Sequence, residues 1–287
     1  MHIIRTLNIS INKKIIIAKS EDEVLKEYLP MFPLNSIQRI NKNINELIPK
    51  ISTNIENDIM QAIRIDSFKD VTELISSSIV QYPKSVINKN KPLYEACRLG
   101  HKDIVKILLE NGADVNYLSG YIIETPLHIA VFNGHDYIAS VLLDFGADYG
   151  VKCQCGYTAL HYASRKGYVR LIEKLIKVGA NVNEKITKIA EFDERLKPQT
   201  PLQLSADSGH KNCCEILLKH GASVNERNSN GQTALHIAAI RGNADVVIVL
   251  LKNGASLKLQ SDDGHTPIQA AEKNGKNEII PLLKRRI

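Results

Sequence analysis

One four-residue string recurs along this chain at a nearly constant spacing. Its leading threonine returns after 33 residues three times and after 42 residues once, where residues 184–199 carry a nine-residue insertion. A fixed period of this size indicates stacked copies of one small unit. The copies are Thr-Pro-Leu-His at Thr125, Thr-Ala-Leu-His at Thr158, Thr-Pro-Leu-Gln at Thr200, Thr-Ala-Leu-His at Thr233 and Thr-Pro-Ile-Gln at Thr266.

Glycines hold fixed places in the same period. An earlier unit also fits, because Lys91 opens a Lys-Pro-Leu-Tyr string 34 residues before Thr125, with Gly100 and Gly112 behind it. A glycine after a short helix supplies a turn in which φ can be positive. In four units this glycine follows the leading threonine by nine residues, at Gly134, Gly167, Gly209 and Gly242.

These motifs resemble ankyrin repeats, whose T-P-L-H, G-H and G-A-D-V-N elements stand at residues 125–128, 134–135 and 112–116. The resemblance covers residues 91–287, and a weaker unit precedes it, in which Ala62, Val71, Leu74 and Ile75 align with Ala96, Val105, Leu108 and Leu109. It implies an all-α solenoid of helix-turn-helix repeats with β-hairpin-like finger loops. The expected units are 57–90 (degenerate), 91–124, 125–157, 158–199 with the insertion, 200–232, 233–265 and a C-terminal cap at 266–287.

The apolar residues of each unit form two stripes at helical spacing. In one unit these are Leu127, Ile129 and Ala130, then Ile138 and Leu142. Neither short helix can bury its stripe alone, so adjacent units must bury each other's apolar faces. Small residues on the first helix let neighbouring units approach closely, and they are Ala130, Ala163, Ala206 and Ala238.

The threonine and histidine of the repeated string are interpreted as scaffold. The threonine suits a helix N-cap, where its oxygen accepts a bond from a free backbone N–H, and a proline at the next position suits the first helical residue. In the resembling family the histidine bridges neighbouring units. We therefore expect His128, His161 and His236 to hold the stack together rather than to act in chemistry.

Residues 1–56 do not resemble the repeats and are rich in Ile, Asn and Lys. Residues 7–18 alternate enough to suggest a strand or hairpin, and Ser20 with Glu23 forms a capping box that opens a helix. We expect this segment to form a short N-terminal cap on the apolar face of the first repeat. The alternative is a separate binding module.

The bulk properties favour a protein of the cytosol. No apolar run reaches the roughly 18 residues that a membrane-spanning helix needs, and residues 1–18 lack the continuous apolar stretch of a secretory signal. The five cysteines suit a reducing compartment better than a disulfide framework. A formal charge of +6 favours acidic partners, but the motifs of DNA- and RNA-binding proteins are absent.

Cys153 and Cys155 form a C-x-C with His161 nearby, so zinc binding is conceivable. A structural zinc site needs four converging ligands, and the other cysteines fall on repeat helices, where Cys213 and Cys214 occupy core positions. No cysteine lies beside a partner histidine as a nucleophile would, and phosphate-binding glycine loops are absent. We expect no enzyme activity, no cofactor and no metal.

The repeat register places a set of variable residues on the concave side, where aromatic and arginine side chains favour protein binding. A broken basic row, interrupted by Asp207, would suit an acidic segment on the partner. The alternative is that Tyr121 and Ile122 pack within their loop and that Phe132 covers a neighbouring unit. The expected partner-binding residues are Arg98, Tyr121, Ile122, Glu124, Phe132, Asn133, Phe145, Tyr157, Arg165, Lys166 and Arg241.

The insertion lengthens one finger loop, and its apolar residues recur every three or four positions, at Ile186, Ile189, Phe192 and Leu196. It is expected either to grip the partner or to fold back on the array. The sequence as a whole predicts a monomeric adaptor or inhibitor. In the alternative reading, residues 1–56 recruit a second protein, such as a ubiquitin-ligase component. The Ile, Asn and Lys bias suggests an AT-rich genome. The resemblance to ankyrin proteins implies an effector that an intracellular bacterium delivers into a host cell's cytosol.

Overall fold

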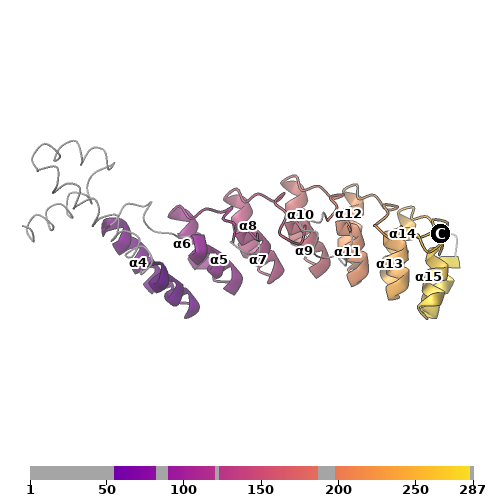
Figure 1. The fold of residues 1–287 in the computed structure, drawn as a ribbon, viewed down its shortest axis with the longest axis horizontal. Coiled ribbons are helices and arrows are strands. Elements are labelled where there is room, and N and C mark those ends of the chain that lie inside the picture. The colour runs from indigo at the N-terminus through magenta and orange to yellow at the C-terminus, as the bar shows by residue number, and fades with distance from the viewer. Residues whose placement is uncertain (1–54, 82–89, 120–122, 187–197, 285–287) are drawn as a thin grey trace, which may run out of the picture. The chain divides into compact units, whose positions relative to one another are not determined.

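The computed structural model describes residues 55–81, 90–119, 123–186 and 198–284 (Figure 1). The predictions for residues 1–54, for Tyr121 and Ile122, and for most of the insertion at 187–197 lie outside these ranges. The chain divides into two compact units, Met1–Asp114 and Val115–Ile287. Each unit is described separately below.

The described part of the first unit consists of helices alone. Residues 55–64 form a helix, followed by α4 (Phe68–Gln81), α5 (Asn90–Leu99) and α6 (Lys102–Glu110). The side chains of Ala62, Val71 and Ile75 are buried. Asp66 ends the first helix with a φ of 55°, in the left-handed region where later repeats use glycine. Its carboxylate lies 2.8 Å from His101 Nδ1, so the side chain ties this turn to the next repeat.

The second unit is a stack of helix pairs, which confirms the predicted ankyrin-type solenoid. The first helices contact one another along the stack, and so do the second helices. Figure 1 shows the pairs side by side. The pairs are α7 (Pro126–Phe132) with α8 (Asp136–Asp144), α9 (Ala159–Lys166) with α10 (Val169–Lys177), α11 (Pro201–Ser208) with α12 (Lys211–Lys219), and α13 (Ala234–Arg241) with α14 (Ala244–Lys252). Helix α15 (Pro267–Lys273), the 3₁₀ turn η3 (Asn277–Ile279) and α16 (Ile280–Lys284) follow.

The repeated string begins each first helix as predicted. Thr125 has extended backbone angles, and its Oγ1 accepts a hydrogen bond from the His128 backbone N–H at 3.3 Å. The His128 ring Nδ1 accepts one from the Thr125 N–H at 3.3 Å, which completes a capping box. Two backbone donors that the helix itself cannot satisfy are therefore bonded.

The same histidines bridge neighbouring repeats. His128 Nε2 lies 3.2 Å from the Tyr157 carbonyl oxygen, and His161 Nε2 lies 3.0 Å from that of Glu184. Because a carbonyl only accepts and Nδ1 already accepts, each ring must be neutral with its proton on Nε2. Burial agrees, since it lowers the pKa of both His128 and His161 to about 4. In α11 the side chain of Gln203 makes the equivalent bond to the Glu226 carbonyl at 2.8 Å.

Glycine after the first helix is required by close packing as well as by backbone shape. Gly167 has a φ of 85°, and a Cβ there would lie 2.8 Å from the His210 ring. His210 Nε2 in turn lies 3.0 Å from the Arg165 carbonyl oxygen. A larger residue at 167 would displace this inter-repeat contact, so the repeated glycine is explained by both effects.

The finger loops turn back without forming strands in the described part of the chain. In three loops one backbone N–H bonds to the carbonyl four residues on, as for Cys153 to Tyr157, Asn228 to Gln232 and Ser261 to His265, each at 2.9 Å. An isolated antiparallel bridge joins Ser119 and Glu124. The loops thus reverse the direction of the chain as a β-hairpin does, but they lack its paired strands.

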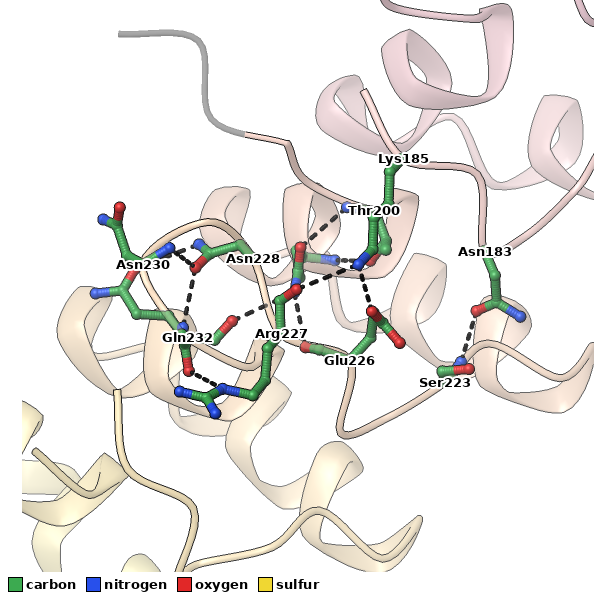
Figure 2. Close-up of polar contacts among 11 residues, drawn as sticks. Asn183, Lys185, Thr200, Ser223, Glu226, Arg227, Asn228, Asn230 and Gln232 are labelled. Carbon is green, nitrogen blue, oxygen red and sulfur yellow. Dashed lines mark hydrogen bonds and ion pairs between the residues drawn. The ribbon is translucent and has the colours of Figure 1, made fainter. Parts of the chain in front are cut away.

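Ion pairs join each of these loops to the next. Lys152 pairs with Glu184, Lys185 with Glu226, and Arg227 with Asp262. Asn183 adds a second tie, because its Oδ1 accepts from the Ser223 N–H at 2.8 Å. Figure 2 shows Lys185, Glu226 and the Asn183 contact together. The loops therefore keep a fixed spacing along this edge of the second unit.

The insertion leaves and rejoins the array at one point. The Ile186 N–H donates to the Gln199 carbonyl at 3.1 Å, which closes the base of the excursion. Ile186 itself is buried in a small cluster with Cys153, Tyr157 and Leu204. The predictions for Ile189, Phe192 and Leu196 concern residues outside the described ranges.

The cysteines in the helices belong to the core. Cys97, Cys213 and Cys214 are buried, as predicted, and burial raises the pKa of Cys213 to about 11. Such a thiol stays protonated and unreactive at neutral pH. Among the helices that the structure describes, none has the length and apolar character needed to cross a bilayer.

Candidate functional site

The most distinctive surface of the second unit gathers aromatic rings and cations on α7 and α9. Phe132 at the end of α7 meets Tyr162 of α9 edge to face, with ring centroids 5.6 Å apart. The Lys166 ammonium lies over the Phe132 ring at 4.8 Å from its centroid. We call Phe132, Tyr162, Arg165 and Lys166 the aromatic surface.

Phe132 is the more exposed of the two rings in this surface. Its side chain is 45% exposed although it contacts both Tyr162 and Lys166. Phe132 does cover a residue of the neighbouring unit, as the alternative interpretation proposed, and it still presents much of its ring to solvent. An aromatic ring held by two neighbours is presented at a low entropic cost, which suits a contact residue.

The prediction that Tyr157 is an exposed contact residue is wrong, because its side chain is only 6% exposed. Its ring packs against Cys153, Ile186 and Leu204, which the finger loop and the base of the insertion bring together. The hydroxyl accepts a hydrogen bond from Arg165 Nη1 at 3.2 Å. Tyr157 therefore supports the aromatic surface, because its ring centroid lies 5.0 Å from that of Tyr162 and its hydroxyl holds Arg165 in position.

Tyr162 is a component that sequence reasoning missed. It stands four residues after Thr158, where other repeats have the buried aliphatic residues Ile129 and Ile237. Its hydroxyl donates to Glu124 Oε1 at 3.4 Å and lies 3.5 Å from Cys153 Sγ. Burial raises the pKa of Tyr162, so the hydroxyl keeps its proton and remains a donor. A polar aromatic residue in an aliphatic position was the available signal.

The two cations of the aromatic surface differ from the other predicted basic residues. No ion pair joins Arg165 or Lys166 to a carboxylate within the described ranges, whereas Arg241 Nε donates to Asp207 Oδ1 at 2.7 Å. In the first unit Arg98 makes two bonds of 2.8 Å to Glu95, which lowers the pKa of that carboxyl. The predicted basic row is therefore neutralised at Arg98 and Arg241.

The remaining predicted residues have other surroundings. Asn133 is the C-cap of α7, and its side chain donates to the Ile129 carbonyl at 2.9 Å. Phe145 is 41% exposed but ends α8, a second helix, and no ring contact among the described residues joins it to the aromatic surface. Glu124 is half-buried beside Tyr162.

The candidate metal ligands do not assemble. Cys153 is buried and Cys155 is exposed, although they are two residues apart. His161 is bonded at both ring nitrogens. In the described ranges, no three His, Cys, Asp or Glu side chains converge as metal ligands would.

Comparison with known proteins agrees with this architecture. The family described as "Ankyrin repeats (3 copies)" matches residues 119–186 and 187–261, and "Ankyrin repeats (many copies)" matches residues 93–140. The crystal structure of the human ASB11 ankyrin repeat domain superposes with a TM-score of 0.66 at 27% identity. That match covers 79% of this chain and 97% of the ASB11 domain.

Two relatives illustrate how widely the repeats occur. The putative ankyrin repeat protein FPV031 of fowlpox virus is 32% identical over 176 residues, which cover 61% of this chain and 50% of that protein. The E3 ubiquitin-protein ligase XBAT32 of Arabidopsis thaliana is 33% identical over 161 residues, 48% of this chain and 31% of that protein. The chain thus spans half or less of these relatives. With its repeated helix pairs, capping boxes and family matches, the chain belongs to the ankyrin-repeat family.

Proposed function

We propose that this chain is a non-catalytic scaffold that binds a partner protein through the aromatic surface of α7 and α9. Ankyrin repeats generally mediate protein–protein interaction, and the observation that carries the specific proposal is the exposed Phe132 ring, held between Tyr162 and Lys166. Because the ring is 45% exposed, burying the rest of it in a complex contributes roughly half of the ~1.5–3 kcal/mol that a fully exposed phenylalanine would. The surrounding cations supply direction and specificity.

The charge of the surface suggests the chemistry of the partner. Arg165 and Lys166 are exposed and have no carboxylate partner within the described ranges. Acidic side chains of a bound segment would form ion pairs with both cations. An apolar side chain of the same segment would cover Phe132. We therefore propose a partner segment that combines an apolar anchor with flanking Asp or Glu residues, and we expect binding to weaken as salt is added.

Affinity capture with matched variants tests this proposal. Phe132→Ala should lose the captured partner, with an affinity roughly thirtyfold lower, as expected for a central aromatic contact. Phe145→Ala is the matched control, because this phenylalanine is similarly exposed, at 41% against 45%, but lies apart from the surface. Circular dichroism and thermal unfolding should be unchanged in both. If the folded Phe132→Ala protein retains the same partner with the same affinity, the aromatic surface is not the binding site.

The second candidate is an adaptor in which residues 1–56 recruit a second protein while the repeats select a target. XBAT32 is named as an E3 ubiquitin-protein ligase, and the ASB11 structure is that of an ankyrin repeat domain. A ubiquitin-ligase component is accordingly the recruited protein to look for. Capture with the full chain and with residues 57–287 separates the two candidates. Loss of ligase subunits together with retention of the target would favour the adaptor.

We also propose the compartment and the oligomeric state in which this function is carried out. No disulfide joins the cysteines in the part of the chain that the structure describes, which suits a reducing compartment such as the cytosol. We propose a monomer, which sedimentation velocity can check. An effector role inside a host cell stays a prediction from composition and resemblance, and translocation of a tagged chain into infected cells is its test.

A further inference from the structure

A groove in the first unit lies between the helix at residues 55–64 and α4. Its volume is about 540 Å³. Ala62, Ile65 and Leu74 form its apolar side, and Asp58, Asp70 and Glu73 bring three carboxylates to it. Ile65 is 62% exposed, a large fraction for an aliphatic side chain beside a groove. The groove therefore combines an apolar floor with negative charge.

The nearby cations do not cancel that charge. Lys69 pairs with Glu73 at 3.8 Å, but both side chains are largely exposed, at 83% and 67%, and such pairs contribute little. Arg64 acts elsewhere, because its charge helps to lower the pKa of Glu95 on α5. A ligand that fits the groove should therefore be both aliphatic and basic.

We propose that residues 1–19 of this same chain bind in the groove. This segment contains seven isoleucines, together with Arg5, Lys13, Lys14 and Lys19, and no Asp or Glu. Its composition is the complement of the groove in both polarity and charge. Isoleucine side chains would cover Ile65 and Leu74, and the lysines would meet the carboxylates of Asp58, Asp70 and Glu73. The inference is independent of the aromatic surface on the second unit.

Covalent linkage favours this occupant over a separate protein. The 35 residues at 20–54 connect the segment to the groove helix, and a chain can span up to about 3.3–3.6 Å per residue, so the connection is long enough. A tethered segment acts at an effective concentration in the millimolar range. An intrinsic Kd near about 1 mM would then suffice to fill the groove for about half of the time.

Zero-length cross-linking of the full chain tests the contact directly. Carbodiimide joins a lysine to a carboxylate only when the two touch. Peptide mapping should find Lys13, Lys14 or Lys19 joined to Asp58, Asp70 or Glu73. Asp103 and Glu110 on α6 are the matched controls, because both are exposed carboxylates of the same unit. Equal cross-linking to these controls would overturn the proposal.

Isotopic mixing identifies which copy supplies the segment. A one-to-one mixture of ¹⁴N- and ¹⁵N-labelled chains should give cross-linked peptides of a single isotope. Peptides that carry both isotopes would show that a second copy fills the groove, and the proposal of an intramolecular contact would then be wrong.

Hydrogen exchange supplies a readout that does not depend on cross-linking chemistry. In the variant Lys13→Gln/Lys14→Gln/Lys19→Gln, amides of residues 55–65 should exchange about three- to tenfold faster than in the parent chain, because the covering segment is weakened. Lys102→Gln/Lys106→Gln on α6 is the matched control and should leave these rates unchanged. Unchanged exchange in the triple variant, with no cross-links to the groove, would refute the contact.

Discussion

Two pairs of neighbouring first helices in the second unit, α7 with α9 and α11 with α13, make a contact of the same geometry with different chemistry. Each of these contacts is called a step below. From α9 back to α7, Lys166 reaches the ring of Phe132, and from α13 back to α11, Arg241 reaches the carboxylate of Asp207. Both cations stand eight residues after their N-cap threonine, and both receiving residues stand seven after theirs. In the first step the positive charge of Lys166 lies over an exposed ring and is not neutralised. In the second step the carboxylate of Asp207 neutralises the charge of Arg241. The scaffold sets where a side chain can reach, and the receiving residue decides what the surface offers.

The largest expected difference between the two steps is in acid sensitivity. Helices α7 and α9 carry His128 and His161, each with its pKa lowered from 6.5 to about 4 by burial. Gln203 at the same place in α11 cannot titrate, so the second step carries one such histidine, His236 of α13, whose pKa burial also lowers. Between pH 6.5 and 4 these two sites bind protons in the unfolded chain that they do not bind in the folded protein, so the free energy of unfolding falls as pH drops through this window. The loss is about 2–3 kcal/mol for each histidine.

Urea unfolding at pH 7 and pH 4.5 checks this prediction. The variant His128→Gln/His161→Gln keeps the bridging bonds that Gln203 makes in α11, so it should fold at pH 7. Its stability should fall by roughly 3–4 kcal/mol less than that of the parent chain on acidification. An equal loss in both proteins would mean that these rings do not govern the acid response.

Converting the first step into the second should abolish the proposed binding. In Phe132→Asp the new carboxylate can pair with Lys166, as Asp207 pairs with Arg241, so both the ring and the charge leave the surface. We expect partner affinity to fall by at least about thirtyfold, since hot-spot losses exceed about 2 kcal/mol. Stability should change by less than about 1 kcal/mol because position 132 is exposed. Titration calorimetry against a captured partner measures the effect, and undiminished affinity would contradict it.

Removing the support beneath the aromatic surface should have a smaller effect. Tyr157→Phe keeps the buried ring and deletes the bond from Arg165, which then loses its fixed position. We expect affinity to fall about three- to fivefold, in keeping with one hydrogen bond of about 1 kcal/mol. Arg165→Ala in the Tyr157→Phe background should then cause less further loss than in the parent chain. Additive losses would show that the two side chains act separately.

Releasing the charge in the second step should have the smallest effect. Asp207→Asn removes the carboxylate that pairs with Arg241, and both side chains are partly exposed, at 32% and 57%. We expect stability to change by less than about 1 kcal/mol. Thermal unfolding at low and high salt should differ less in this variant than in the parent chain. A loss of several kcal/mol would show that the pair matters far more than its exposure suggests.

The repeat period was sufficient to predict the fold. The positions of Thr125 and His128 imply a capping box and a bridge because the same residue types recur at the same places, and a stack allows them one set of neighbours. Cys213 and Cys214 could be assigned to the core for the same reason. The finger loops were less predictable, since the loop at 153–157 turns back with a single backbone bond and no strand.

The candidate site was only partly predictable, because repeat position fixes a backbone place and leaves the side-chain direction open. The repeat position predicts an exposed Tyr157, yet Ile186 and Leu204 from the following repeats enclose its ring. The sequence does not predict Tyr162 as a surface residue, because its repeat position normally holds a buried aliphatic side chain. The row of cations was visible in the sequence, but the pairing of Arg241 with Asp207 depends on a contact across 34 positions.

The closed base of the insertion has a consequence for how such a chain can change over generations. Because the Ile186 N–H and the Gln199 carbonyl meet at 3.1 Å, material added between them need not strain either flanking repeat. The entropic penalty of a longer excursion grows slowly, by about 0.6 kcal/mol for each doubling of its length. This junction should therefore tolerate insertions of different length and sequence while the packing of the other repeats is unchanged.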